Sequence, residues 1–208
     1  MPPHTSNRER PGIPSGERVC VARTPGERAR LEAFVSETYR AAYGARVTHF
    51  LPVLLGIEGC GPGGLVGVIG VKPGSAPGPF FLESYLAEPA ERAVSRAMGR
   101  AVPRTDMAEV GNLSSRARGA GRALISAMCD HLEWVGIAHA VFTGTRALRN
   151  CFARLGVRGH DLGPADGRRL GAALADWGTY YEQDPRVTAV FVPAVREAVV
   201  ADLARRAS

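Results

Sequence analysis

The chain has 208 residues, of which 45% are hydrophobic and 22% are charged. Both fractions are ordinary for a globular protein and argue against global disorder, a collagen-like fibre or a coiled coil. The longest apolar runs, at residues 50–57 and 65–71, are far shorter than the roughly 18 residues that a membrane-spanning helix requires. We therefore expect a folded protein without a transmembrane segment.

The net charge of +6 would suit nucleic acid, a membrane surface or an anionic cofactor. No long block of basic residues interleaved with aromatic residues is present, so we expect no nucleic-acid partner. Residues 1–17 are polar and rich in proline, without the apolar stretch of a secretory signal. We expect a flexible tail over residues 1–17, a single domain over residues 18–208 and a cytoplasmic location. The widely spaced cysteines predict free thiols and no metal site: Cys20, Cys60, Cys129 and Cys151.

The first half of the chain predicts a helix, a hairpin and a second helix. A short strand at residues 19–21 precedes an amphipathic helix that ends near Gly44, and its residues recur at helical spacing: Leu31, Phe34, Val35, Thr38, Tyr39 and Ala42. The apolar runs at residues 50–57 and 65–71 are separated by a turn-rich segment and predict a β-hairpin. Residues 89–98 favour a helix.

The second half alternates strands with helices. The predicted elements are, in order, a strand at residues 108–113, a helix from Gly121, a strand at 138–143, a helix at 147–155 closed by Gly156, a strand at 157–162, a helical stretch at 166–175, an aromatic cluster at 177–181, a strand at 187–192 and a helix from Pro193. This alternation predicts an α/β fold with a mixed sheet flanked by helices. We expect antiparallel hairpins in the first half and parallel pairing in the second.

The segment Arg116-Ala-Arg-Gly119-Ala-Gly121 follows a predicted strand and opens a predicted helix. Small residues at such a turn let the backbone approach a ligand, and the free N–H groups of the first helical turn attract an anion. A Walker loop would need a Gly-Lys-Ser/Thr ending and a dinucleotide-binding fold would need G-x-G-x-x-G, and neither motif is present in this segment. The spacing R-x-x-G-x-G matches the acyl-coenzyme A loop of the GNAT acyltransferase superfamily. The alternative is a turn that serves packing alone.

A second stretch of the chain resembles a segment of the GNAT acyltransferases. Thr143-Gly-Thr145 ends a predicted strand, and LRNCFARLG at residues 148–156 forms the next helix with its glycine cap. Glu109 lies on the strand before the glycine-rich loop, where acyltransferases of this shape often carry a carboxylate that orients an amine or acts as a base. The alternative for Glu109 is a solvated edge position or a buried ion pair.

Four blocks of the chain resemble the thermostable hemolysin family. They are Phe81-Leu-Glu-Ser-Tyr-Leu86 with Pro89, the stretch EVGNLS at residues 109–114, a block with Phe142-Thr143, Thr145, Leu148-Arg-Asn150, Phe152 and Arg154-Leu-Gly156, and Trp177-Gly-Thr-Tyr-Tyr181 with Pro185. The blocks occur in order over roughly residues 28–192, which is most of the chain. The family is similar to GNAT-fold proteins and, more distantly, to acyl-homoserine lactone synthases.

In those synthases a glutamate within an E-x-x-R stretch helps to place the amine substrate. The corresponding stretch here is Glu109-Val-Gly-Asn112, so the resemblance does not imply a homoserine lactone synthase. The family name implies lysis of cells, but the sequence contains no long amphipathic pore segment and no spanning helix. A lytic effect could arise indirectly, if the protein makes an acylated, surface-active product.

The resemblance implies a GNAT-like acyltransferase that moves an acyl group from a thioester to a small amine. The donor would be acyl-CoA or an acyl carrier protein as co-substrate, with no permanently bound cofactor. We expect the phosphopantetheine arm of the donor at Arg116, Gly119, Gly121, Arg122 and Asn150, although Asn150 would equally suit a helix cap. Backbone N–H groups at residues 110–113 would polarise the thioester carbonyl, and Gly111 would permit the bulge that exposes them.

Glu109 is the expected base, acting through water, and Glu83 is a second carboxylate that either binds the amine or is only a surface or turn residue. In many GNAT enzymes a tyrosine on the short helix returns a proton to the leaving thiolate, but the corresponding stretch here offers Cys151 and Phe152. We expect a substrate pocket walled by aromatic residues; the alternative is that these residues form simple core. They are Trp177, Tyr180 and Tyr181, with Thr143 beside them.

Two functions remain open at this point. The first is an N-acyltransferase that uses an acyl thioester, which the intact R-x-x-G-x-G spacing favours. The second is a non-catalytic or membrane-active protein that keeps a GNAT-like shape, which the missing tyrosine favours. Fold similarity alone does not separate them.

Overall fold

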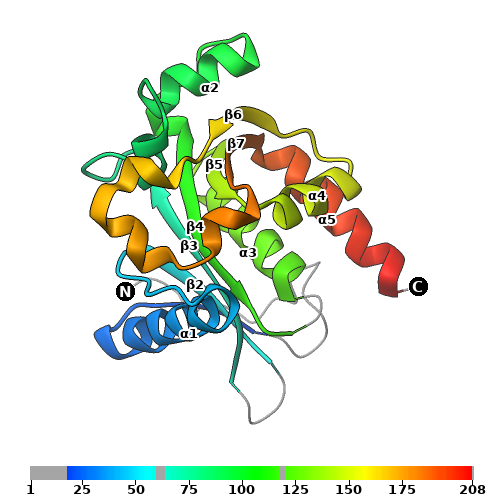
Figure 1. The fold of residues 1–208 in the computed structure, drawn as a ribbon. Coiled ribbons are helices and arrows are strands. Elements are labelled where there is room, and N and C mark those ends of the chain that lie inside the picture. The colour runs from blue at the N-terminus through cyan, green and yellow to red at the C-terminus, as the bar shows by residue number, and fades with distance from the viewer. Residues whose placement is uncertain (1–17, 60–63, 118–119, 208) are drawn as a thin grey trace.

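The structure of the protein is a computed structural model that describes residues 18–59, 64–117 and 120–207. The tail expected at residues 1–17 lies outside these ranges, as do Cys60 and Gly119. A mixed sheet of seven strands runs through the described chain, and helices lie on both of its faces (Figure 1). The predicted α/β fold with a mixed sheet is confirmed.

The sheet has the strand order β1-β2-β3-β4-β5-β7-β6. Neighbouring strands are antiparallel except β4 and β5, which are parallel. The strands are β1 (Arg18–Val21), β2 (Val53–Glu58), β3 (Leu65–Pro73), β4 (Met107–Ser115), β5 (His139–Gly144), β6 (His160–Pro164) and β7 (Arg186–Phe191). The predicted hairpin is the pair β2 and β3.

The longer helices and the short 3-10 helices complete the fold. The α-helices are α1 (Pro25–Tyr43), α2 (Ala90–Met98), α3 (Ala120–Trp134), α4 (Arg146–Arg154) and α5 (Val192–Ala207). The 3-10 helices are η1 (Phe81–Tyr85), η2 (Arg104–Asp106), η3 (Gly167–Trp177) and η4 (Tyr180–Gln183). Each helix predicted from the sequence has an α-helical counterpart among them, except the stretch predicted at residues 166–175, which lies in the 3-10 helix η3.

Successive residues of the central strands point to opposite faces of the sheet and meet different helices. Leu55 and Ile69 belong to the core cluster that contains residues of α3, α4 and α5. Their neighbours Leu54 and Val68 pack on the other face, in the cluster formed with α1. Burial on both faces is the reason that β2 and β3 are continuous apolar runs without alternation.

Helix α1 has strong signals at both ends. Thr24 is the N-cap and forms a capping box with Glu27, because each side chain accepts a hydrogen bond from the other residue's backbone N–H. Gly44 ends the helix in the left-handed conformation, with φ 68°. These caps determine the position of the last helical turn, which carries Tyr39 and Tyr43.

Parallel pairing in the second half of the chain is correct for β4 and β5 only. The strand predicted at residues 157–162 is β6, which begins at His160 and pairs with β7 instead of β5. Strand β7 lies between β5 and β6 and is antiparallel to both. The middle of β7 is buried, whereas β6 contains Gly163 with φ 138° and then Pro164, which suit an edge strand.

The helical stretch predicted at residues 166–175 is a pair of 3-10 segments. Gly171, with φ 57° and ψ −130°, interrupts η3, and this conformation is essentially restricted to glycine. The second segment ends at Trp177, whose ring centroid lies 6.4 Å from that of Tyr39. The break at Gly171 therefore lies shortly before Trp177, where the chain packs against α1.

Gly178 holds this aromatic segment against the end of α1. Its backbone has φ 50° and ψ −127°, and a Cβ atom at this position would lie 2.0 Å from the carbonyl oxygen of Tyr43. The following residue, Thr179, donates its backbone N–H to the same oxygen at 2.9 Å. A residue with a side chain therefore cannot replace Gly178 without moving the backbone.

We expect Gly178→Ala to lower the free energy of unfolding by roughly 3 kcal/mol or more, through backbone strain and overlap. Gly26→Ala in the first turn of α1 is the matched control, because an added Cβ atom there meets nothing within 4 Å. Alanine favours a helix, so the control should be neutral or more stable by up to about 1 kcal/mol. Urea unfolding measures both, and an unchanged midpoint for Gly178→Ala would contradict this packing.

Candidate active site

Strands β4 and β5 separate after a short parallel pairing. Residues 107–110 of β4 pair with residues 139–142 of β5, and the pairing ends there. Beyond this point β4 continues beside β3 as far as Ser115, while β5 continues beside β7 as far as Gly144. The two strands therefore enclose a wedge in the middle of the sheet.

A β-bulge in β4 lies beside this wedge. The register between β3 and β4 shifts between Val68 and Gly70, where β4 has one residue more than its partner. Asn112 has φ 50°, a left-handed conformation that asparagine adopts more readily than most residues with a side chain. The bulge predicted within residues 110–113 is present, but its left-handed residue is Asn112 and not Gly111.

Asn112 also fastens the segment that follows α1. Its Oδ1 accepts a hydrogen bond from the backbone N–H of Leu51 at 2.9 Å, and its Nδ2 donates to the carbonyl oxygen of His49 at 3.2 Å. A Cβ atom on Gly111 would lie 3.2 Å from Leu51 Cδ1, so a small residue suits this contact. In the sequence Asn112 stands out only as a replacement for arginine, and this role of its side chain cannot be seen there.

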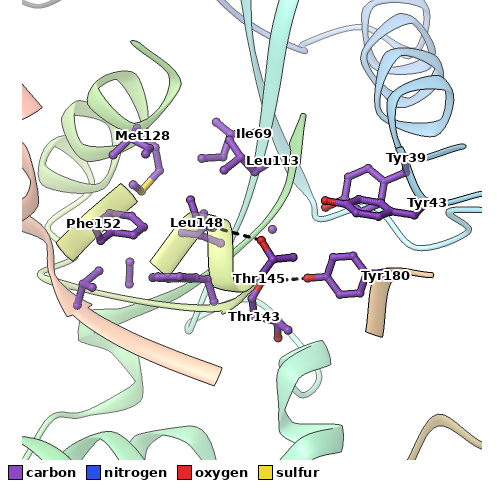
Figure 2. Close-up of a pocket in the computed structure, with 16 residues that line it drawn as sticks. Tyr39, Tyr43, Ile69, Leu113, Met128, Thr143, Thr145, Leu148, Phe152 and Tyr180 are labelled. Atoms are coloured by element: carbon purple, nitrogen blue, oxygen red, sulfur yellow. Dashed lines mark hydrogen bonds between the residues drawn. The ribbon is translucent and has the colours of Figure 1, made fainter. Parts of the chain in front are cut away.

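A cavity of about 150 Å³ occupies the wedge, and we call it the wedge cavity (Figure 2). Its walls come from both faces of the sheet, with Met128 of α3 and Phe152 of α4 on one side and Tyr39 and Tyr43 of α1 on the other. The remaining lining is mostly apolar: Ile69, Val110, Gly111, Leu113, Ile125, Ala140, Phe142, Thr143, Thr145, Leu148, Tyr180 and Val190. The cavity therefore passes through the sheet where the strands diverge.

A second cavity, of about 60 Å³, adjoins the first, and we call it the ring-lined cavity. Six of its lining residues carry aromatic rings: Tyr39, His49, Phe81, Tyr85, Trp177 and Tyr180. Glu109 and Asn112 supply polar side chains. The two cavities have in common Tyr39, Val110, Gly111, Thr143 and Tyr180, so they meet beside the bulge.

Glu109 is the buried carboxylate of the ring-lined cavity. Its residue is 5% exposed, and its oxygens accept hydrogen bonds from the backbone N–H groups of Phe81 at 2.8 Å and Leu82 at 2.9 Å. Burial raises the pKa of Glu109 to about 6, although both N–H donors and the charge of Lys72 favour the ionised form. At neutral pH Glu109 is therefore ionised and more basic than an ordinary glutamate.

His49 lies at the same cavity and was not singled out by the sequence. Its ring stacks on Phe81, with 5.3 Å between the centroids. Burial, helped by the charge of Lys72, lowers the pKa of His49, so its imidazole is neutral at pH 7. The residue belongs to an irregular segment without periodicity, which is why no pattern pointed to it.

Glu83, the second predicted carboxylate, lies outside both cavities. Arg104 donates to both of its oxygens, at 2.7 and 3.0 Å, and the backbone N–H groups of Phe80 and Ala90 donate as well. Burial works to raise the pKa of Glu83, but these donors outweigh it and lower the pKa. Glu83 thus connects η1, α2 and η2, and its expected role in binding the amine is not supported by its position.

The two arginines predicted for the donor arm are engaged within the fold. Arg116 Nη2 lies 2.9 Å from Glu37 Oε2, and its guanidinium carbon lies 4.4 Å from the ring centroid of Phe34. Arg122 Nε lies 2.9 Å from Asp202 Oδ2 of α5. These contacts tie the end of β4 to α1 and the start of α3 to α5, so both side chains have partners within the fold.

The other positions predicted for the donor arm remain accessible where they are described. Gly121 lies in the first turn of α3, and a Cβ atom added there would meet nothing within 4 Å. Asn150 is exposed on α4 and does not cap the helix, because Thr145 is the N-cap. Gly119 lies outside the described residues. Donor binding at these positions stays a prediction.

The predicted aromatic pocket is divided. Trp177 lines the ring-lined cavity, while Tyr180 and Thr143 line both cavities and are joined by a 3.2 Å hydrogen bond from the Tyr180 hydroxyl to the Thr143 carbonyl oxygen. Tyr181 lines neither cavity, and its hydroxyl is hydrogen-bonded to that of Tyr85. For Tyr181 the packing alternative is therefore the better description.

Several solved structures of acyltransferases share this fold, although their sequences have low identity to this chain. FeeM, an N-acyl amino acid synthase from uncultured soil microbes, is 19% identical, with a TM-score of 0.62 over 88% of this chain and 94% of FeeM. MesI, a CoA-dependent acyl-homoserine lactone synthase, is 14% identical, with a TM-score of 0.56 over 90% of this chain and 95% of MesI. The acyl-homoserine lactone synthase LasI is 11% identical, with a TM-score of 0.57 over 88% of this chain and 94% of LasI. The protein has a GNAT-like acyltransferase fold.

Residues 21–195 match the thermostable hemolysin family, and the chain belongs to that family. The family resemblance carried by the four sequence blocks is thus confirmed. None of the curated proteins matches the chain in sequence. In the described part of the chain, no helix has the length and apolar character needed to cross a membrane, and no cluster of His, Cys, Asp and Glu side chains is suited to hold a metal ion.

The bulge yields a test of what Asn112 contributes. Asn112→Ala loses both side-chain hydrogen bonds and must adopt φ 50° with an ordinary side chain, so it should cost roughly 2–3 kcal/mol of stability. Asn112→Gly loses the same hydrogen bonds without the conformational strain and should cost about 1 kcal/mol less. Thermal unfolding compares them, and equal costs would show that the left-handed conformation carries no strain.

Proposed function

We propose that the protein is an N-acyltransferase that moves an acyl group from an acyl thioester to a small amine. The observation that carries this proposal is the meeting of two cavities at the β4 bulge, with the buried carboxylate of Glu109 in one of them. Acyl transfer between two substrates needs two approaches to one reacting carbon. The wedge cavity and the ring-lined cavity supply one approach each.

The wedge cavity suits the donor. Its apolar lining from α3, α4 and the diverging strands fits an acyl chain or the arm of a thioester. The first turn of α3 lies at the end of the chain segment that leaves β4, and its N–H groups and open space at Gly121 suit a phosphate. Because Arg116 and Arg122 are engaged elsewhere, we assign phosphate binding to backbone N–H groups and not to these side chains.

The ring-lined cavity suits the amine. Glu109 is ionised at neutral pH and faces a wall of aromatic rings, which would accept an apolar or planar group on the amine. We propose that Glu109 removes the surplus proton of the amine nitrogen as it attacks the thioester carbonyl carbon. Backbone N–H groups at residues 110–113 would stabilise the charge that forms on the carbonyl oxygen.

The named activities of proteins with this fold support a thioester donor. FeeM is described as an N-acyl amino acid synthase, MesI as CoA-dependent, and a further synthase, BjaI, was solved with SAM and isopentyl-CoA. By analogy we propose acyl-CoA or an acyl carrier protein as co-substrate and an amine or amino-acid-like acceptor. The analogy rests on the fold alone.

Incubation of the protein with acyl-CoA and acyl carrier protein donors of different chain length, and with a panel of amino acids and simple amines, tests the proposal. We expect release of free thiol matched by an N-acylated product in the mass spectrum. Heat-inactivated protein is the control for spontaneous aminolysis. Donor binding without any transfer product would favour a non-catalytic binding protein instead.

We expect the reaction to require ionised Glu109. The acceptor amine also titrates, but its effect cancels when the kcat/KM of the wild type is divided by that of Glu109→Gln at each pH. This ratio should rise with pH up to about 6, where Glu109 loses its proton, and then level off at roughly 10²-fold or more. A ratio near one at every pH, with an intact fold, would remove Glu109 from the mechanism.

We expect Gly121→Asp to weaken donor binding, because it places bulk and negative charge where the phosphate would lie. Ala97→Asp, on the exposed side of α2, makes the same charge change on a different helix and should leave binding unchanged. Calorimetry with coenzyme A measures both. Equal affinity of the Gly121→Asp variant and the wild type would argue against a phosphate site at the start of α3.

A further inference from the structure

Acyl transfer from a thioester leaves a sulfur atom that needs a proton. Even a cysteine thiol has a pKa near 8.5 in water, and burial of a thiol in an apolar site raises its pKa further. Cys129, on α3 next to the cavity-lining Met128, illustrates this, since burial raises the pKa of its thiol to about 12. A thiolate that departs into the wedge cavity would be a poor leaving group unless a nearby acid protonates it.

Few side chains in the wedge cavity carry a proton that they could give. Phe152 of α4 has none. The Tyr180 hydroxyl already donates a hydrogen bond to the carbonyl oxygen of Thr143. The hydroxyls of Thr143 and of Thr145, the N-cap of α4, belong to aliphatic alcohols, which are far weaker acids than a phenol. The remaining phenols are Tyr39 and Tyr43, which α1 contributes from the opposite face of the sheet.

Tyr39 is held firmly while its hydroxyl stays free. Its ring stacks on Tyr180 with centroids 6.1 Å apart and makes edge contacts with Tyr43 and Trp177. Among the described residues, none forms a hydrogen bond with the Tyr39 hydroxyl. Figure 2 shows that this hydroxyl and that of Tyr43 point from α1 toward Thr145. An unpaired phenol in this position is available to a group bound in the cavity.

Tyr39 is better placed than Tyr43, because it lines both cavities whereas Tyr43 lines the wedge cavity alone. The thioester carbon must lie where the two cavities meet, since the donor and the amine approach it from different sides. Burial raises the pKa of Tyr39 well above its usual value, so the phenol keeps its proton at physiological pH and acts as a donor, not as a base.

We propose that Tyr39 is a further catalytic residue, the acid that protonates the departing sulfur; this rests on the proposed acyltransferase function. The amine nitrogen forms a bond to the thioester carbon, and its surplus proton goes to Glu109. The C–S bond then breaks with its electron pair on sulfur, and the Tyr39 hydroxyl gives its proton to that sulfur. Glu109 loses its proton to water and Tyr39 regains one from water, so the net products are an amide and a thiol.

Two donors with different leaving groups test this assignment. Hexanoyl-CoA releases an alkyl thiol that needs a proton, whereas the hexanoyl thioester of 4-nitrothiophenol releases a stable thiolate that does not. Hydroxylamine at pH 8 serves as a small acceptor for both, with the spontaneous reaction subtracted. We expect Tyr39→Phe to lower kcat by about 10²-fold with hexanoyl-CoA and by less than about threefold with the aryl thioester.

The melting temperature of Tyr39→Phe should stay at the wild-type value, because the lost hydroxyl has no partner among the described residues. An equal loss with both donors would show that Tyr39 only shapes the cavity, and no loss with either donor would overturn the proposal as well. Tyr43→Phe, one turn further along α1, is the matched comparison. A loss that depends on the leaving group in Tyr43→Phe alone would move the role to Tyr43.

The same assay separates this inference from the function on which it rests. If the wild type transfers hexanoyl groups and Tyr39→Phe does so equally well, the acyltransferase proposal stands and the role of Tyr39 is wrong. If the wild type transfers from neither donor, both proposals fall together.

Discussion

The early end of the pairing between β4 and β5 is the constraint on which the rest of the site depends. Had this parallel ladder continued, backbone hydrogen bonds would have closed the sheet and left no passage through it. Because pairing stops at Val110 and Phe142, side chains from helices on opposite faces reach the same space. Tyrosines of α1 and apolar residues of α3 and α4 thus line one cavity, although the sheet otherwise separates these helices.

Contacts on both sides of the wedge keep it open. Asn112 binds the backbone of the segment after α1 and holds the bulge on the β4 side. On the β5 side, Tyr180 donates to the carbonyl oxygen of Thr143, and Arg149 of α4 donates to that of Gly144 at 2.9 Å. Both strands are therefore fastened after they part, which presents the cavity walls in a preorganised form.

The short helix η1 and the residue before it donate hydrogen bonds to two carboxylates that behave differently. Its N-terminal N–H groups donate to Glu109, and the N–H group that precedes it donates to Glu83. Arg104 neutralises Glu83, and the pKa of Glu83 falls, whereas burial beside aromatic rings raises the pKa of Glu109 to about 6, and no described arginine pairs with it. The same element thus leaves one carboxylate structural and the other suited to take a proton.

Local patterns in the sequence determined the elements, because periodic apolar residues, the caps of α1 and turn glycines act over a few residues. The position of Glu109 before the glycine-rich loop and the family resemblance were also visible there. Only the tertiary structure decided which charged side chains form ion pairs within the fold, since Arg116, Arg122 and Glu83 pair with residues far away in the chain. It also decided that β7 enters between β5 and β6, and that Tyr39 meets Tyr180. Such contacts depend on how distant segments pack, and no spacing along the chain encodes them.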